Sequence, residues 1–315
     1  MLRIVFMGTP EFSVPALRAT AAKYQVAGVF TQPDRPVGRG LDLRASPVKL
    51  EAERLGIPVF QPESLVPEEN FAKLQALQPD VIVVVAFGQI LKRNVLDLPR
   101  LGCVNIHSSL LPRWRGAAPI QRALLAGDME TGVTTMRIAP KLDAGDILLQ
   151  AKTPISGTDT AGTLHDRLAI LGADLLMQTL DGLESGSLTG QVQDESRVTY
   201  AQKLSKEMET LNPDLTAIEL DRQVRALHPW PGTSVRVQLP EGPLRLKIRS
   251  ALLHSEISGP KGKIFDKAGM ILLGCSEGCL ELRNVQWEGK REVDMNGFVN
   301  GLRGRGQNLP LEVKP

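Results

Sequence analysis

The chain carries an amide and an imidazole two residues apart at the end of an apolar segment. The segment is NIHSSLLPRWRGAAPIQ, residues 105–121, and the preceding VNI is typical of the end of a buried strand. Because side chains alternate along a strand, Asn105 and His107 are expected to point the same way, about 7 Å apart at the backbone. Pro112 stiffens the turn that follows. No obvious nucleophile accompanies the pair.

A carboxylate is expected to approach this pair. The segment KLDAGDILL, residues 141–149, places Asp143 in a tight Ala-Gly turn before an apolar strand. A carboxylate beside an imidazole sets its tautomer and raises its basicity. Without an activated Ser or Cys, the three side chains indicate transfer to a nucleophile that the substrate brings. The alternative is structural: His107 is a satisfied core histidine, Asn105 caps a turn, and Asp143 makes only local hydrogen bonds.

The elements that must position these side chains alternate between two periods in the first half of the chain. Short β-branched apolar runs indicate buried parallel strands, and segments with helical spacing lie between them. The runs are RIVFMG, QVAGVFTQ, IPVF, DVIVVVAFG and GCVNIH. We therefore expect an α/β domain with a Rossmann-like, mostly parallel sheet, helices on both faces, and ligands at the carboxyl ends of the strands. No G-x-G-x-x-G or G-x-x-x-x-G-K-[ST] occurs, which disfavours the common nicotinamide, flavin and triphosphate sites.

The pattern changes after about residue 190. A polar segment, residues 190–206, is typical of a connecting arm. From Thr233 onward, period-two alternation with Gly-rich turns indicates the short antiparallel strands of a small barrel or sandwich. We expect a domain at 1–189, an arm at 190–206 and a second domain at 207–315; the family resemblance given below implies that the first is catalytic and the second an OB-like β-barrel.

Composition narrows the class of protein. At 315 residues and a formal charge of +2, the chain is long enough for two domains, and its charge does not by itself indicate nucleic acid. Cys103, Cys275 and Cys279 are too few for a disulfide framework, which fits a reducing compartment. The CSEGC segment lacks a second pair of zinc ligands and is expected to form a hairpin with small buried cysteines. The longest uncharged apolar run, VIVVVAFGQIL, is too short to span a bilayer as a helix, so we expect a cytoplasmic protein without membrane contact.

Taken together, the motifs resemble the folate-dependent formyltransferases. NIHSSLLPRWRGAAPIQ with LDAGDIL, preceded by VVVAFGQIL, carries the resemblance. GTPEF, FTQPDRPVGRG, SPVK, VTYAQKLSKE and HPWPG stand in the order found in the branch that formylates methionyl-tRNA. Ser108 stands where the family usually has another small residue or Pro. The resemblance implies transfer of the formyl group of 10-formyltetrahydrofolate, a co-substrate, to the α-amine of methionine on charged initiator tRNA, without a metal and by a monomer.

The chemistry of this reaction agrees with the residue types. An α-amine has a reference pKa of about 7.7 to 8.0, which an aminoacyl ester lowers, so no strong base is needed. The demand is to stabilise the oxyanion that forms on the formyl group, by Asn105 as donor and His107 as donor or acid. Asp143 positions His107 and helps to move the proton. By resemblance, two segments line the pterin pocket: Phe87, Gln89, Ile90 and Leu91, and Ser109, Leu110, Leu111 and Pro112.

Two basic segments are candidates for contact with tRNA. The loop TQPDRPVGRGLDLRAS, residues 31–46, is long for a connection in such a domain, where about 2 to 6 residues are usual. It carries Arg35, Arg39 and Arg44, and the resemblance places it at the acceptor end. The alternative is a solvated surface loop.

The second basic segment is PLRLKIRSALL in the expected barrel. Its apolar residues alternate with Arg245, Lys247 and Arg249, which share one face and could track a phosphate backbone. A solvated outer face is the alternative.

Two other functions compete with this assignment. One is another folate-dependent formyltransferase, acting on a sugar nucleotide or a purine precursor; the barrel and the loop at 31–46 favour tRNA instead. The other is a non-catalytic RNA-binding protein, against which the intact Asn105, His107 and Asp143 argue.

Overall fold

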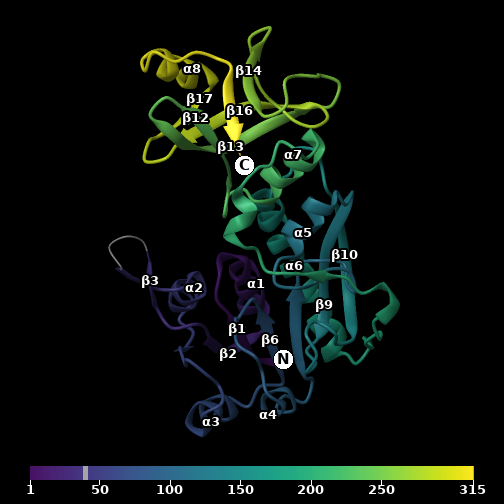
Figure 1. Ribbon diagram of the computed structural model, residues 1–315. Coiled ribbons are helices and arrows are strands. Elements are labelled where there is room, and N and C mark those ends of the chain that lie inside the picture. Colours follow the sequence, from purple (N-terminus) through teal and green to yellow (C-terminus); the bar gives the residue numbers. More distant parts are fainter. Residues whose placement is uncertain (38–41, 315) are drawn as a thin grey trace. The chain divides into compact units, whose positions relative to one another are not determined.

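The protein divides into two compact units in a computed structural model that describes residues 1–37 and 42–314 (Figure 1). The first unit comprises Met1–Pro119, Glu130–Pro154 and His165–Ala201. The second comprises Ile120–Met129, Ile155–Leu164 and Gln202–Pro315. The domain limits expected from the sequence, 1–189, 190–206 and 207–315, stay a prediction.

The first unit is built on a seven-stranded sheet with the order β10-β9-β7-β6-β1-β2-β5. The five strands from β7 to β5 in that order are parallel to one another, and β9 runs antiparallel to both of its neighbours, β7 and β10. Strand β6 is buried over its whole length, as expected for a strand covered on both faces. The mostly parallel sheet is confirmed. The strands are β1 (Arg3–Gly8), β2 (Gln25–Phe30), β5 (Val59–Phe60), β6 (Val81–Val85), β7 (Cys103–His107), β9 (Glu130–Arg137) and β10 (Ile147–Pro154).

Helices cover both faces of this sheet. On one face, Leu74 and Val95 of two helices share an apolar cluster with Val84 of β6. On the other face, Gly172 lets a long helix approach β7 so closely that a Cβ there would lie 2.9 Å from Ile106. The cross-strand partner of Val84 is Asn105, which directly precedes Ile106 in β7. The side chains of Asn105 and Ile106 therefore point to opposite faces of the sheet. The helices of this unit are α1 (Val14–Lys23), α2 (Pro47–Arg54), α3 (Glu68–Ala76), α4 (Arg93–Leu96) and most of α6 (Ala161–Glu184).

Two short strand pairs complete the first unit. Strand β3 (Arg35–Val37) pairs antiparallel with β4 (Asp42–Arg44). Strand β8 (Arg115–Gly116) pairs parallel with β11 (Tyr200–Ala201), which brings the end of the expected arm against the segment that follows β7.

The second unit contains a closed antiparallel barrel. The strands follow the order β13-β12-β18-β14-β15-β16-β17, and an additional pairing of β13 with β16 closes the ring. The OB-like barrel is thereby confirmed. The strands are β12 (Thr233–Leu239), β13 (Gly242–His254), β14 (Lys263–Lys267), β15 (Met270–Gly274), β16 (Cys279–Trp287), β17 (Glu292–Asp294) and β18 (Leu311–Lys314); the helices are α7 (Ala217–Ala226), α8 (Met295–Arg303) and most of α5 (Pro119–Ala126).

The barrel is filled by apolar side chains and covered by α7. Leu220 and Val224 of α7 belong to the same buried cluster as the inward residues of the strands. A capping box between Thr216 and Glu219 starts this helix. The CSEGC segment forms the expected turn between β15 and β16, with both cysteines free and buried. Among the described helices, none has the length and apolar character needed to cross a membrane.

Candidate active site

Asn105 and His107 lie at the carboxyl end of β7, where open α/β sheets bind ligands. In the ladders, Asn105 is level with Val84 of β6, and His107 is level with Thr134 of β9. The imidazole is buried, at 6% exposure, whereas Asn105 is partly exposed. Within the described parts of the chain, the Asn105 amide makes no hydrogen bond. It is a donor at a strand end that is available to a ligand.

The ring of His107 is oriented by a backbone carbonyl. Its Nε2 lies 2.9 Å from the carbonyl oxygen of Trp114. A carbonyl only accepts hydrogen bonds, so Nε2 carries the hydrogen. The other ring nitrogen, Nδ1, faces Oδ2 of Asp143 at 3.8 Å, beyond direct hydrogen-bond distance. The Trp114 carbonyl therefore sets the tautomer, and the carboxylate acts on Nδ1 only through its charge.

The carboxylate of Asp143 is also held by the backbone. The Gly116 amide donates to Oδ2 at 2.8 Å. Asp143 has a φ of 46°, in the left-handed region, so the turn places this side chain in an uncommon backbone conformation. Gly116 has a φ of 122°, and a Cβ there would lie 2.7 Å from the carbonyl oxygen of Ala201, so this close approach requires glycine. The structure thus places Asp143 beside His107, and Asn105 lies two residues before His107 in the same strand.

Hydrogen bonds to Thr134 of β9 hold the loop that follows β7. The hydroxyl of Thr134 donates to the Ser109 carbonyl at 2.7 Å and accepts from the Leu111 amide at 3.1 Å. The Ser109 hydroxyl donates to the Arg113 carbonyl at 2.6 Å. Ser109 and Leu111 are buried, whereas Leu110 and Pro112 are partly exposed. Any ligand at this loop meets a backbone whose shape is fixed in advance.

The other segment expected at the pterin follows β6, the parallel neighbour of β7, so both segments leave the same edge of the sheet. Their four side chains differ. Phe87 is buried and Leu91 packs against the same apolar cluster. Gln89 donates to the carbonyl of Pro62 at 2.8 Å. Ile90 is 91% exposed and is the apolar side chain of this segment most available to a ligand.

Comparison with known proteins adds the family. The family described as Formyl transferase matches residues 2–180, and the one described as Formyl transferase, C-terminal domain, matches residues 203–303. The methionyl-tRNA formyltransferase of Methylococcus capsulatus is 50% identical over 310 residues, covering 98% of this chain and 99% of its own length. That of Marinobacter nauticus is 48% identical over 301 residues, covering 95% of this chain and 96% of its own. The chain belongs to the methionyl-tRNA formyltransferase family.

Solved structures share the fold of this formyltransferase. WlaRD, a sugar 3N-formyl transferase solved with dTDP and 5-N-formyl-THF, has a TM-score of 0.66 and 20% identity over 92% of this chain and 99% of its own. HypX from Aquifex aeolicus, solved with tetrahydrofolic acid, has a TM-score of 0.65 and 16% identity over 100% of this chain and 51% of its own. At these identities the likeness establishes the fold alone.

Within the basic loop of the formyltransferase, the antiparallel pairing of β3 with β4 sets two cations opposite each other. Arg35 of β3 is the cross-strand partner of Arg44 of β4, and both are exposed. Like charges directly opposite destabilise a strand pair, and an anion between them would relieve the repulsion. The nearby Asp34 is engaged elsewhere, with Lys49 at 2.7 Å, and that hydrogen bond lowers the pKa of Asp34. Arg39 lies outside the described residues.

The three cations expected to form a phosphate track on β13 differ in their partners. Arg245 forms an ion pair with Glu209, and Arg249 donates to Oε1 of Gln286 at 2.5 Å. Lys247 is partly exposed and has no ion pair in the part of the chain that the structure describes. Two of the three are therefore engaged within the barrel unit.

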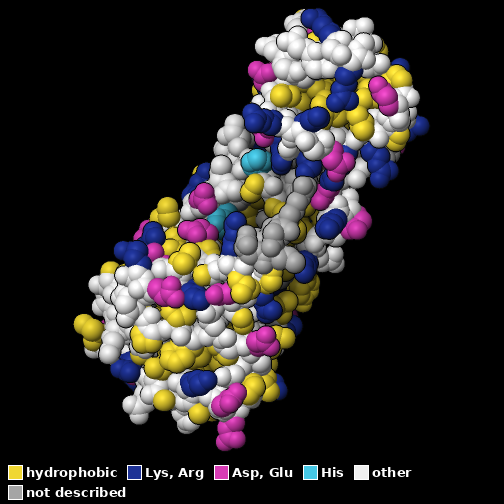
Figure 2. Space-filling model, turned by 90° about the vertical axis from the view of Figure 1, so that its left-hand side faces the viewer, with side chains coloured by type: hydrophobic (Ala, Val, Ile, Leu, Met, Phe, Trp, Pro, Cys, Tyr) yellow, Lys and Arg dark blue, Asp and Glu magenta, His cyan; other side chains and the backbone are white. Residues whose placement is uncertain are grey.

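A second row of cations runs across neighbouring strands of the barrel. The sequence pattern of a single strand did not predict this row. Arg236 of β12 stands opposite Arg245 on one side and opposite Lys314 of β18 on the other. Arg236 and Lys314 are exposed and make no ion pair with the described residues. On the face in Figure 2, Lys and Arg side chains are dispersed among acidic and hydrophobic ones. A site for anions would therefore be indicated by the alignment of cations on neighbouring strands and not by a uniformly basic surface.

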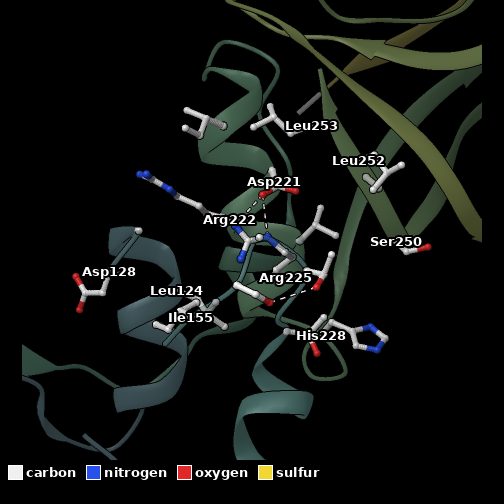
Figure 3. Close-up of a pocket in the computed structure, with 18 of the residues that line it drawn as sticks. Leu124, Asp128, Ile155, Asp221, Arg222, Arg225, His228, Ser250, Leu252 and Leu253 are labelled. Atoms are coloured by element: carbon white, nitrogen blue, oxygen red, sulfur yellow. Dashed lines mark hydrogen bonds and ion pairs between the residues drawn. The ribbon is translucent and has the colours of Figure 1, made fainter. Parts of the chain in front are cut away.

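The second unit also contains a cavity of about 640 Å³, walled by α7, β13, the end of α5 and the segment before α6 (Figure 3). Its lining is largely apolar, with Leu124, Ile155 and Leu252 among its members. On α7, Arg225 pairs with the buried Asp221 at 2.8 Å. Among the described residues, no cluster of three His, Cys, Asp or Glu side chains suitable for a metal is found.

Proposed function

We propose that this protein transfers the formyl group of 10-formyltetrahydrofolate to the α-amine of methionine on charged initiator tRNA, for translation initiation. The observation that carries the proposal is the side-chain amide of Asn105, which makes no hydrogen bond to the described residues, two positions before the anchored His107 at the carboxyl end of β7. Relatives about half identical over nearly the whole chain support the same activity.

The site fits a formyl donor. A free amide and an imidazole at one strand end suit a carbonyl oxygen that gains charge, and the exposed Ile90 offers apolar surface at the same edge. The co-substrate supplies a formyl group bonded to nitrogen. The Asn105 amide would donate to the formyl oxygen as the methionine amine attacks the formyl carbon. One such donor commonly lowers the barrier by about 3 to 4 kcal/mol.

His107 and Asp143 would handle the proton. The new bond joins the amine nitrogen to the formyl carbon, and the bond from that carbon to the folate nitrogen breaks. One proton must therefore pass from the amine to the departing nitrogen. Nδ1 of His107 is the ring nitrogen free to exchange a proton, because Nε2 is committed to the Trp114 carbonyl. The Asp143 carboxylate, 3.8 Å away, would stabilise the imidazolium.

The tRNA would be held by discrete cations. We assign phosphate contacts to Arg35 and Arg44 of the β3–β4 hairpin and to Arg236 and Lys314 of the barrel, because each pair sets like charges opposite each other. Lys247 is a further candidate. Phosphate contacts of this kind supply affinity and position the acceptor end without reading the base sequence.

We further propose that the protein works in the cytoplasm, where its substrates for translation occur, and that it does so as a monomer. Light scattering of the purified protein at working concentration tests the second statement. The chain has a mass of 34.3 kDa, and a measured mass near twice that value would contradict the monomer.

The experiment that tests the function is a transfer assay with purified components. The protein is mixed with 10-formyltetrahydrofolate and charged initiator tRNA, and formylmethionine is released from the tRNA and quantified. Charged elongator methionyl-tRNA and a nucleoside-diphosphate amino sugar serve as competing acceptors. Rapid transfer to the initiator alone is expected; transfer only to the sugar, or to no acceptor, would overturn the proposal.

A further inference from the structure

Arg115 is the largest fully buried side chain among the residues that the structure describes, with an exposed fraction of 0%. Its Nε donates to Oε1 of Gln193 at 3.0 Å, and its Nη2 donates to Glu195 at 2.8 Å. Its Nη1 is buried without a partner among the described residues. Burying a guanidinium with an unsatisfied nitrogen is costly, so a buried Arg at this position calls for a specific role.

Gln193 connects this arginine to the turn that carries Asp143. Its Nε2 donates to the carbonyl oxygens of Asp143 and Gly145, at 2.8 and 2.7 Å. The orientation of the amide is unambiguous, because a guanidinium only donates and a carbonyl only accepts. The oxygen of Gln193 must therefore face Arg115, and its nitrogen must face the turn. Gln193 itself is 5% exposed.

We propose that Arg115 and Gln193 are positioning residues for the reaction, which act through Asp143. Gly116 holds the Asp143 carboxylate through its amide, and the preceding Arg115 holds the Asp143 backbone through Gln193. The two consecutive residues, Arg115 and Gly116, thus hold both the main chain and the side chain of Asp143. This inference rests on the proposed function, because it assigns the pair a part in the same transfer.

The turn needs such support because of its own backbone. Asp143 adopts a positive φ, which costs a non-glycine residue free energy that the surroundings must supply. A shift of about 1 Å at a reacting group can lower a rate about 10²-fold. Holding the Asp143 carboxylate at a fixed distance from Nδ1 of His107 is therefore worth a dedicated pair of buried polar side chains.

The experiment compares Gln193→Glu and Gln193→Met with Gln191→Met as a control. Glu at position 193 can still accept a hydrogen bond from Arg115 but cannot donate to the two carbonyls. A loss of activity in Gln193→Glu would therefore come from the freed turn and not from an unpaired buried arginine. Gln191 lies in the same arm with an exposed side chain. Both Gln193 variants should lower kcat for formyl transfer about 10- to 100-fold and leave both KM values within about twofold. The Gln191 variant should retain the wild-type kcat.

Two further measurements decide the mechanism. In an Asp143→Asn background, Gln193→Glu should change kcat by less than about threefold, because the residue acts through Asp143. Hydrogen exchange of residues 141–146 should be faster in Gln193→Glu than in wild type by at least about tenfold. An unchanged kcat in Gln193→Glu, or additive effects with Asp143→Asn, would overturn the inference. If the wild type shows no transfer, the proposed function fails, and unchanged exchange would still overturn the positioning of the turn.

Discussion

The side chains proposed for catalysis in the first unit and the basic side chains of the barrel are held in different ways. His107 and Asp143 are anchored by main-chain groups, the Trp114 carbonyl and the Gly116 amide. The β13 arginines are anchored by other side chains; Arg245, for example, pairs with Glu209.

This difference fits the role that we propose for each region. A main-chain anchor moves only if the fold moves, so it fixes one ring nitrogen and one carboxylate for proton transfer. A side-chain pair can rearrange when a polyanion arrives, but its cation is already neutralised. We infer that Arg236 and Lys314, which have no ion-pair partner in the described part of the chain, contribute more to RNA affinity than the paired cations do.

Removing the donors at the first site should have the largest effect. Asn105→Ala and His107→Ala should each lower kcat about 10²- to 10³-fold, because the first removes a donor to the formyl oxygen and the second removes the carrier of the proton that leaves the amine. Steady-state transfer kinetics measure the effect, with circular dichroism as the control for folding. A rate near that of wild type in either variant would remove that residue from the proposed mechanism.

Removing only the charge of Asp143 should cost less than removing a donor. Asp143→Asn keeps an oxygen for the Gly116 amide but no longer stabilises the imidazolium, so kcat should fall about 10²-fold. Transfer rates between pH 6 and 8 show whether the residual rate depends on pH differently from wild type. Identical rates and profiles would mean that Asp143 is only a turn residue.

Breaking a buried side-chain pair in the barrel unit should act on stability. Arg225→Met leaves the buried Asp221 without its cation, and the free energy of unfolding should fall by about 3 kcal/mol. Urea denaturation measures this change. Arg222→Met is the matched control, because Arg222 lies on the same helix and donates no hydrogen bond to the described residues. Equal losses in the two variants would show that the ion pair itself contributes little.

The two sets of barrel cations can be compared directly. Neutralising Arg236 and Lys314 to Gln should raise KM for charged tRNA and reduce the slope of log KM against log salt by about 1 for each contact. Neutralising Arg245 and Arg249 should change that slope by less than about 1 in total, because both are already paired. The opposite ranking would show that the β13 face, as first expected, is the phosphate track.

The smallest expected effect concerns His254 of β13. The ring of His254 donates hydrogen bonds to Glu281 and to Glu256, and these bonds, the one to Glu281 most, raise the pKa of His254 above its ordinary value. A raised pKa stabilises the fold at low pH, and this contribution is lost as pH rises from about 6.5 through the raised pKa of the folded state. Between pH 6 and 8, Tm of the wild type should therefore fall relative to Tm of His254→Gln. A constant difference between the two proteins would contradict this linkage.

The sequence alone was enough to predict the layered α/β sheet, the barrel and the pair at the end of β7. Period-two and helical patterns are local, and a strand such as VIVVV is buried wherever it lies. The spacing of Asn105 and His107 determines that they share one side of a strand, whatever the rest of the fold does. The tight turn in KLDAGDILL marked Asp143 as a candidate, whereas its position 3.8 Å from Nδ1 of His107 is a contact between distant segments that only the fold creates.

What only the tertiary structure decided depends on contacts between distant segments. Gln193 is an ordinary polar residue in a polar arm, and nothing near it in the chain marks it as a partner of Arg115 or of the Asp143 turn. The pairing of Arg236 with Lys314 arises because β12 and β18, at opposite ends of the barrel sequence, become neighbours in the sheet. Backbone groups such as the Trp114 carbonyl are the same in every residue, so their roles leave no trace in composition or spacing. Local periodicity records which face of an element is buried, whereas hydrogen bonds and like-charge contacts between elements exist only once the chain has folded.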